Sequence, residues 1–383
     1  MNRLLIITLF FITLLLASCA VLPPLQKSKL IAIFHLIEIS NYPEAKRVAE
    51  EMIEDENANQ WPRTWYARGL LCQTAYQEGM RRNNRRMFEL YEDQLYVAYE
   101  SYEKALELDT RNSIAKQLAP KYILLANDFK TMGTQHFNGR RYEEALRAFE
   151  KALTINESPV LIAYIDTNLV YNAAIAAIES KKKDKAIKHL KRLDGYNFST
   201  NVTHLLSSTY LEKGDTLNAE KVLQEGVKKY EDNEGLVLLL ADLQFNKGDT
   251  EQSLLTLTRA HSQDPENYIF PYTKGLIYQK TEQYNLAIAN YKDALKLAPD
   301  ESKIYTNIAI CYYNIGVEIE DNSRLLTSNR AVEEEREKSK AAYESASSWL
   351  RQASDIGGSN QASALQLQQR LNRLNITLDA TSD

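Results

Sequence analysis

The chain has little glycine, little proline and almost no cysteine. Its 383 residues include 13 glycines, 9 prolines and 3 cysteines, against 23 tyrosines. Tight turns between strands rely on glycine and proline, so this balance favours helices that pack through aromatic side chains. Cys72 and Cys311 lie among apolar and tyrosine neighbours and are expected to pack as small hydrophobic residues.

The chain also lacks a strong charge of one sign. It carries 46 Lys and Arg against 51 Asp and Glu, a formal net charge of −5. A mildly acidic, mixed surface has no electrostatic footprint for nucleic acid, so no nucleic-acid partner is expected. The hydrophobic content of 44% is typical of a folded protein, and the length predicts two or three domains or an elongated array.

No catalytic or metal-binding pattern is present in the sequence. The five histidines (His35, His136, His189, His204 and His261) are scattered, with no HExxH motif. There is no phosphate-binding loop, dinucleotide fingerprint or nucleophile elbow either. The sequence therefore predicts a protein that is not an enzyme and has no cofactor or metal. A hydrolase hidden in the insertions is a weaker alternative.

One apolar run stands at the start of the chain. Leu4 to Leu16 is uncharged and shorter than the roughly 20 residues that a membrane-spanning helix needs. The run leads into LASC, Leu16 to Cys19, which resembles a bacterial lipobox. The resemblance implies a lipoprotein signal peptide at 1–18 and a lipidated tether at 19–25. It also implies a diacylglyceryl group on the Cys19 sulfur, then cleavage before Cys19 and acylation of the new amino terminus, with palmitate among the acyl chains. A plain secretory signal with an incidental cysteine is the alternative.

The most informative feature is an internal period of 34 residues. The tetrapeptide KGDT occurs at Lys213–Thr216 and again at Lys247–Thr250, and Pro265 and Pro299 have the same separation. A fixed period of this size predicts stacked helix-pair units. A phosphate-binding loop would need more glycines, so KGDT is interpreted as a turn in which glycine ends one helix and Asp or Thr begins the next.

The clearest units, 126–159 and 268–301, resemble tetratricopeptide repeats. With Ala126 as position 1, Gly133 and Ala145 occupy the small positions 8 and 20, and Phe149 occupies position 24. Helices cross closely only where a side chain is small, and an aromatic ring from the neighbouring helix fills the adjoining space.

The resemblance predicts an all-α fold, a tetratricopeptide-repeat α-solenoid of about seven to eight helix pairs. Its expected parts are irregular N-terminal units with an insertion at 26–112, a regular array at 113–301, a final unit with long inserted helices at 302–358, and a C-terminal capping helix and tail at 359–383.

In such an array the first helix of each unit lines a concave surface, which motif positions 2, 5, 9 and 12 are expected to face. Asn side chains can pair with a peptide backbone, and tyrosines supply amphipathic contact area. The candidate partner-binding residues are Asn127, Lys130, Phe137, Asn168, Tyr171, Asn201, His204, Asp242, Phe245, Tyr272 and Tyr313. Thr134 stands where a dicarboxylate clamp would have Asn, so chaperone-tail recognition is not expected.

Together the two resemblances imply a membrane-anchored scaffold that binds proteins or extended peptides in the bacterial cell envelope. Ala20 follows Cys19 where an inner-membrane lipoprotein often has Asp, so the outer membrane, facing the periplasm, is the expected location. A periplasmic lipoprotein that binds a small ligand or glycan in its Tyr- and Asn-lined groove is the alternative. The basic segment Arg81–Arg86 is interpreted as a solvated linker, with contact to anionic lipid or an acidic partner as the alternative.

Overall fold

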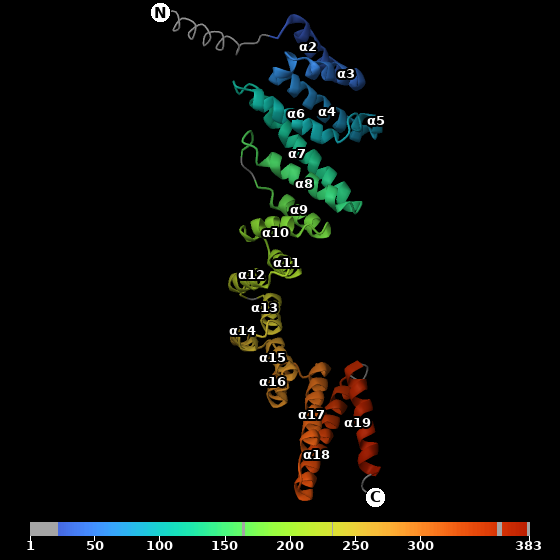
Figure 1. Ribbon diagram of the computed structural model, residues 1–383, viewed down its shortest axis with the longest axis vertical. Helices are drawn as coiled ribbons and strands as arrows, with labels where there is room; N and C mark the ends of the chain where they lie inside the picture. Colours follow the sequence, from blue (N-terminus) through green and yellow to red (C-terminus); the bar gives the residue numbers. More distant parts are fainter. Residues whose placement is uncertain (1–21, 163–164, 232, 358–361, 381–383) are drawn as a thin grey trace, which may run out of the picture. The chain divides into compact units, whose positions relative to one another are not determined.

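The structure is a computed structural model that describes residues 22–162, 165–231, 233–357 and 362–380 (Figure 1). Within these ranges every regular element is a helix, and the helices follow one another as antiparallel pairs. The predicted all-α helical-repeat fold is thus confirmed. The chain divides into two compact units, one ending at Phe198 and the other beginning at Ser199, and each is described by itself.

The first unit contains four helix pairs. They are α2 (Pro24–Glu38) with α3 (Tyr42–Glu54), α4 (Pro62–Arg82) with α6 (Gln94–Leu108), α7 (Ala115–Asn138) with α8 (Tyr142–Asn156), and α9 (Thr167–Glu179) with α10 (Lys183–Asp194). A short 3-10 turn, η1 (Ala58–Gln60), precedes α4, and α5 (Arg85–Phe88) lies in the insertion between α4 and α6. Cys19 and the lipobox lie outside the described residues.

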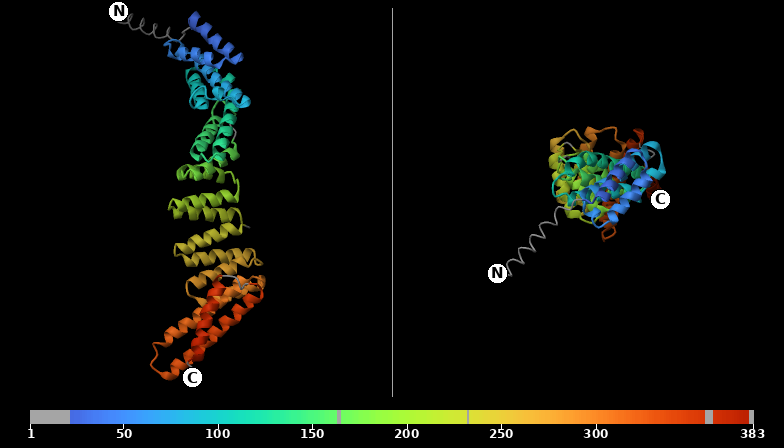
Figure 2. Two further views of the ribbon diagram at one scale, coloured as in Figure 1. Left: turned by 90° about the vertical axis from the view of Figure 1, so that its right-hand side faces the viewer. Right: turned by 90° about the horizontal axis from the view of Figure 1, so that it is seen from above.

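The second unit contains four more pairs and a final helix. The pairs are α11 (Thr200–Glu212) with α12 (Thr216–Lys229), α13 (Glu234–Asn246) with α14 (Thr250–Gln263), α15 (Ile269–Lys280) with α16 (Tyr284–Leu297), and α17 (Ser302–Ser323) with α18 (Asn329–Asp355); α19 (Ala362–Ala380) follows. Figure 2 shows α11 to α16 stacked as successive antiparallel pairs. Eight pairs in the described residues agree with the predicted seven to eight.

Four helix pairs share one close contact between a glycine and an aromatic ring. The contacts are Gly69 with Tyr102, Gly133 with Phe149, Gly275 with Tyr291, and Gly316 with Tyr343. A methyl group on any of these glycines would lie 2.5–2.6 Å from a ring carbon, closer than van der Waals contact allows. The contact between α4 and α6 forms although an insertion separates the two helices in sequence. Packing of a small residue against a large one therefore stabilises this irregular pair as well.

The turn inside each regular repeat has one recurring backbone conformation. Position 15 of the repeat has a positive φ in all five units that start at 126, 167, 200, 234 and 268. The five residues are Arg140, Lys181, Gly214, Gly248 and Glu282, with φ between 58° and 87°. At Gly214 and Gly248, within the KGDT segments, the residue with positive φ is glycine, which adopts this conformation without steric strain; the other three positions carry side chains. The next N–H then bonds the carbonyl five residues back, as Asp215 does to Tyr210 at 2.9 Å, which closes the helix end.

Helix α7 is longer than the repeat pattern indicates. It begins at Ala115 rather than at Ala126 and contains Pro120, which cannot donate a helical hydrogen bond. Leu118, Tyr122 and Leu125 are fully buried on this added stretch. Burial of these side chains stabilises the helix on both sides of the proline, because the transfer of each from water contributes about 1.5–3 kcal/mol to the free energy of folding.

The last helix covers the end of the second unit. Ala364, Leu367 and Leu371 of α19 join one buried cluster with Ala346 and Leu350 of α18. Ser328 stands at the N-cap position of α18, but its side chain makes no capping hydrogen bond.

Candidate partner-binding face

The candidate surface is the exposed side of the first helix in each repeat. The five candidate polar residues Asn127, Asn168, Asn201, His204 and Asp242 are exposed, and Lys130, Phe137, Tyr171, Phe245, Tyr272 and Tyr313 are half-buried. All eleven therefore retain contact with solvent. The structure gathers five of them around two hollows, one in each unit.

The hollow in the first unit is aromatic. It has a volume of about 330 Å³, and its lining consists of Thr134, Phe137, Phe149, Tyr171, Asn172 and Ile175 from α7, α8 and α9. Phe149 is only 2% exposed and forms the floor, because its ring is seated against Gly133. Of the other lining residues Thr134 is exposed and the rest are half-buried, and none of the described lining residues carries a charged group.

Neighbouring rings hold the two candidate aromatic residues of this hollow. Phe137 packs edge-on against Tyr142 with ring centroids 5.2 Å apart, and Tyr171 stacks on Phe198 at 5.6 Å. Such contacts contribute about 0.5–1.5 kcal/mol beyond area burial. The walls are therefore preorganised, which lowers the entropic cost of binding.

Lys130 is engaged within the chain. Its ammonium group lies 2.7 Å from a carboxylate oxygen of Asp166, the residue that caps α9 by accepting a hydrogen bond from the backbone N–H of Leu169 at 3.0 Å. Burial raises the pKa of Asp166, but the hydrogen bonds from Lys130 and Leu169 outweigh it and hold the pKa below the ordinary value. Lys130 thus links α7 to the start of α9.

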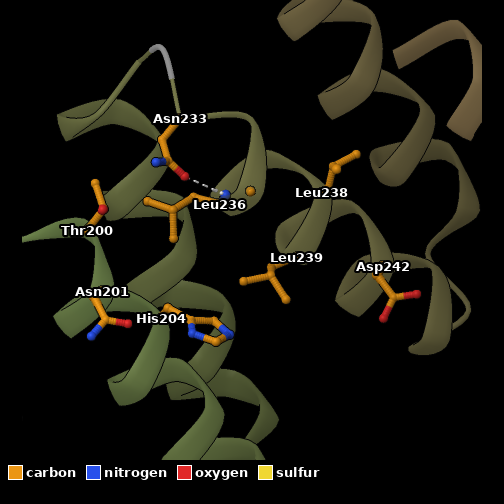
Figure 3. A pocket seen from close by; sticks show the side chains of 9 residues that line it. Thr200, Asn201, His204, Asn233, Leu236, Leu238, Leu239 and Asp242 are labelled. Carbon is orange, nitrogen blue, oxygen red and sulfur yellow. Dashed lines mark hydrogen bonds between the residues drawn. The ribbon is translucent and has the colours of Figure 1, made fainter. Parts of the chain in front are cut away.

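The hollow in the second unit is larger and differs in chemistry. Its volume is about 620 Å³. Figure 3 shows Thr200, Asn201 and His204 of α11 on one side, Leu238 and Asp242 of α13 on the other, and Leu236 and Leu239 between them. Asn233 and Gly235 complete the lining. Three of the candidate residues, Asn201, His204 and Asp242, therefore border one cavity.

Two polar side chains of this hollow have defined partners. Asn233 Oδ1 accepts the backbone N–H of Leu236 at 2.9 Å and so caps α13. Asp242 Oδ2 accepts a hydrogen bond from Asn246 Nδ2 at 2.9 Å. The Asn246 amide carries no charge, so the negative charge of Asp242 faces the hollow without a cationic partner among the described residues that line it.

The other candidate aromatic residues lie outside both hollows. Lys280 approaches the ring of Phe245 to 5.3 Å. Tyr272 packs on Tyr291 at 5.7 Å, accepts a hydrogen bond from Asn307 and lies beneath Lys303, and its burial raises the pKa of its hydroxyl. Tyr313 packs on Tyr343 at 5.5 Å. These three rings therefore contact other side chains of the second unit.

Sequence reasoning overlooked the apolar part of the second hollow. Gly235 and Leu238 occupy positions 2 and 5 of the unit that begins at Glu234, the positions expected to face the groove. Neither residue is among the polar and aromatic candidates. Where earlier units carry Asn127, Asn168 and Asn201 at position 2, Gly235 leaves the space open.

The two cysteines of the described residues and the basic segment have defined surroundings in the structure. Burial raises the pKa of the Cys72 and Cys311 thiols to about 12, so both stay protonated at neutral pH. In the basic segment, Arg81 and Arg82 both pair with Glu78, and Arg85 pairs with Glu89. Within the described ranges there is no cluster of three His, Cys, Asp or Glu residues that could hold a metal ion.

In the part of the chain that the structure describes, no helix is both long enough and apolar enough to span a membrane. The apolar run at the start of the chain lies outside the described residues.

Comparison with known proteins finds a repeat-family match and distant relatives. A family model described as tetratricopeptide repeat matches residues 272–301. The BBSome complex member BBS4 of Bos taurus is 21% identical over 49% of this chain and 35% of its own length. The TPR repeat-containing protein YpiA of Bacillus subtilis is 26% identical over 45% of this chain and 39% of its own length. The chain thus matches less than two fifths of either relative.

Solved structures with a similar arrangement have low identity. A TPR repeats protein from Bacteroides fragilis is 19% identical, with a TM-score of 0.36 over 65% of this chain and 98% of that one. A structure of MamA protein is 16% identical, with a TM-score of 0.34 over 50% and 95%. The family match falls on α15 and α16, whose helices repeat the pairing seen along both units. The chain is therefore a helical-repeat protein, and α15 and α16 contain the stretch that matches the tetratricopeptide repeat model.

Proposed function

We propose that this protein is a lipid-anchored scaffold of the bacterial cell envelope that binds extended segments of partner proteins on the first-helix face of its repeats. The observation that carries the proposal is the gathering of candidate residues around two hollows: Phe137 and Tyr171 in one, and Asn201, His204 and Asp242 in the other. No catalytic step is part of the proposal.

The chemistry of the face suits a peptide backbone and its side chains. An extended segment presents N–H and C=O groups that must find partners when water is displaced. Asn172 and Thr134 lie beside apolar rings in the first hollow, and Asn233 lies beside leucines in the second. Each hollow therefore combines hydrogen-bonding groups with space for one apolar side chain.

Photo-crosslinking in intact cells tests this use of the face. A benzoylphenylalanine placed at Asn168 or His204 is expected to crosslink to a protein, because both side chains are exposed on first helices. The matched control is Glu225, an exposed residue on the second helix α12, where no comparable crosslink is expected. Crosslinks of equal strength from all three sites, or from none of them, would contradict the proposal.

The envelope location rests on the sequence of the undescribed leader. Cys19 is proposed as the lipidation site, and α2 begins at Pro24, so the first repeat would lie close to the membrane that holds the acyl chains. The outer membrane, facing the periplasm, is the proposed location.

Replacing Cys19 by alanine is expected to move the protein from the membrane fraction to the soluble fraction, because acyl chains are the proposed attachment. Fractionation of cells after a high-salt wash measures this, with Cys72→Ala, which removes a buried thiol, as the control. A Cys19→Ala protein that still sediments with membranes would show that something other than the lipid holds it there.

A further inference from the structure

The hollow of the second unit has a charge that the hollow of the first unit does not have. Among the described residues that line it, Asp242 is the one carboxylate, and neither lysine nor arginine is present. The lining of the first hollow contains only uncharged side chains. A positive charge therefore increases the affinity of a ligand for the second hollow, whereas a negative charge on the ligand would be repelled.

The apolar and the acidic parts of the second hollow lie side by side on α13. Leu238 and Leu239 precede Asp242 by four and three residues, the separations at which helix side chains are neighbours about 5–6 Å apart. An extended chain rises about 3.3 Å per residue and turns alternate side chains to the same side. Two residues separated by one other are therefore about 6.5 Å apart on one side of such a chain, close to the spacing on the helix.

The opposite part of the hollow suits the peptide backbone. Asn233 uses its Oδ1 atom to cap α13, and its Nδ2 atom makes no hydrogen bond among the described residues. That amide can donate to a peptide carbonyl. Gly235 beside it has no side chain, and a methyl group there would meet no atom closer than 3.4 Å, so the backbone of a ligand can approach α13 at this point.

From this geometry we infer that the second unit recognises an extended segment of a partner protein in which an apolar residue and a lysine or arginine are separated by one residue. The apolar side chain packs on Leu238 and Leu239, and the cationic group pairs with Asp242. The inference rests on the proposed use of the face and specifies the partner's sequence chemistry there.

Selection from a phage-displayed library of random linear peptides on the full chain in detergent micelles tests the inference. Peptides with an apolar residue two positions from Lys or Arg are expected to be enriched. A fluorescein-labelled consensus peptide is then expected to bind Asp242→Asn about tenfold more weakly, because the variant lacks the carboxylate that pairs with the cationic side chain. Asp242→Lys should favour peptides with Glu at the basic position.

A second variant tests the shape of the hollow without removing a charge. Gly235→Asn restores the residue found at position 2 of earlier units and costs no helix stability, because Asn is at least as good a helix former as Gly. It is expected to reduce binding of the consensus peptide about tenfold while circular dichroism and thermal unfolding stay unchanged. Ser363→Asn on the exposed part of α19 is the matched control and should bind like the original chain.

The outcomes separate this inference from the proposed function. Enriched peptides that lack a basic residue would overturn the inference. So would peptides that bind Asp242→Asn and Gly235→Asn as tightly as they bind the original chain. If such peptides instead lose affinity in Tyr171→Ala, the peptide-binding face stands and only its partner chemistry is wrong. If the library yields no enriched peptide, both the inference and the peptide-binding function fail.

Discussion

Replacing Gly275 by alanine is expected to destabilise the second unit by about 2–3 kcal/mol, because the added methyl group overpacks the core. The new Cβ atom would lie 2.5 Å from the ring of Tyr291. That ring is fully buried, and its hydroxyl donates a hydrogen bond of 2.6 Å to Gln279 Oε1, so it has no room to move aside. Trp349 packs against the cluster that contains Tyr291, and its fluorescence during urea unfolding measures the loss.

Gly235→Ala is the matched control for this substitution. It makes the same chemical change in a helix of the same unit, but the nearest atom to the new methyl group is Asn233 Oδ1 at 3.4 Å. It is expected to be neutral or to stabilise by up to about 1 kcal/mol, the difference in helix propensity. In a Tyr291→Leu background the cost of Gly275→Ala should shrink, and an unchanged cost would show that the ring contact is not its cause.

Replacing Asp128 by asparagine is expected to stabilise the first unit at neutral pH and to have little effect near pH 4. Asp128 lies on α7 and is largely buried against α4, where it accepts hydrogen bonds from Gln77 Nε2 at 2.7 Å and Gln73 Nε2 at 3.4 Å. Burial raises its pKa from 3.8 to about 6, although the two amide hydrogen bonds favour the charged form. Both bonds reach Oδ2, so the carbonyl oxygen of asparagine can replace it.

The direction of this pH dependence follows from the raised pKa of Asp128. The folded state holds a proton on Asp128 more tightly than the unfolded state does, so this contribution is complete below pH 3.8 and is lost as the pH rises through about 6. A shift of about two pKa units corresponds to about 2–3 kcal/mol, which Asp128→Asn should recover at pH 7.5.

Urea unfolding at several pH values, followed by the fluorescence of Trp61 and Trp65 in the first unit, measures this difference. Glu144→Gln, an exposed carboxyl change on α8, is the control and should follow the original chain at every pH. A constant difference between Asp128→Asn and the original chain from pH 4 to pH 7.5 would contradict the titration of Asp128.

The repeat positions bring only some of the candidate residues together. Positions 2, 5, 9 and 12 led to Asn201, His204 and Asp242, which the structure places around one hollow. The same rule included Lys130, whose charge is paired with Asp166 outside its own repeat. Position within a repeat indicates which way a side chain faces, but it does not reveal which neighbour occupies the space in front of it.

The sequence by itself determined the helix pairs and the packing between the two helices of a regular pair. The 34-residue period, the small residue at position 8 and the large apolar residue at position 24 are local requirements of the repeat, and the pairs Gly133 with Phe149 and Gly275 with Tyr291 meet them with an aromatic ring. Such requirements recur at a fixed spacing and can be read without coordinates.

Only the tertiary structure decided the features that depend on contacts between different repeats. The start of α7 at Ala115 and the burial of Asp128 against Gln73 and Gln77 each occur once. They arise because a side chain far away in sequence fills a space or leaves it empty. A repeat period cannot record a contact that is not repeated.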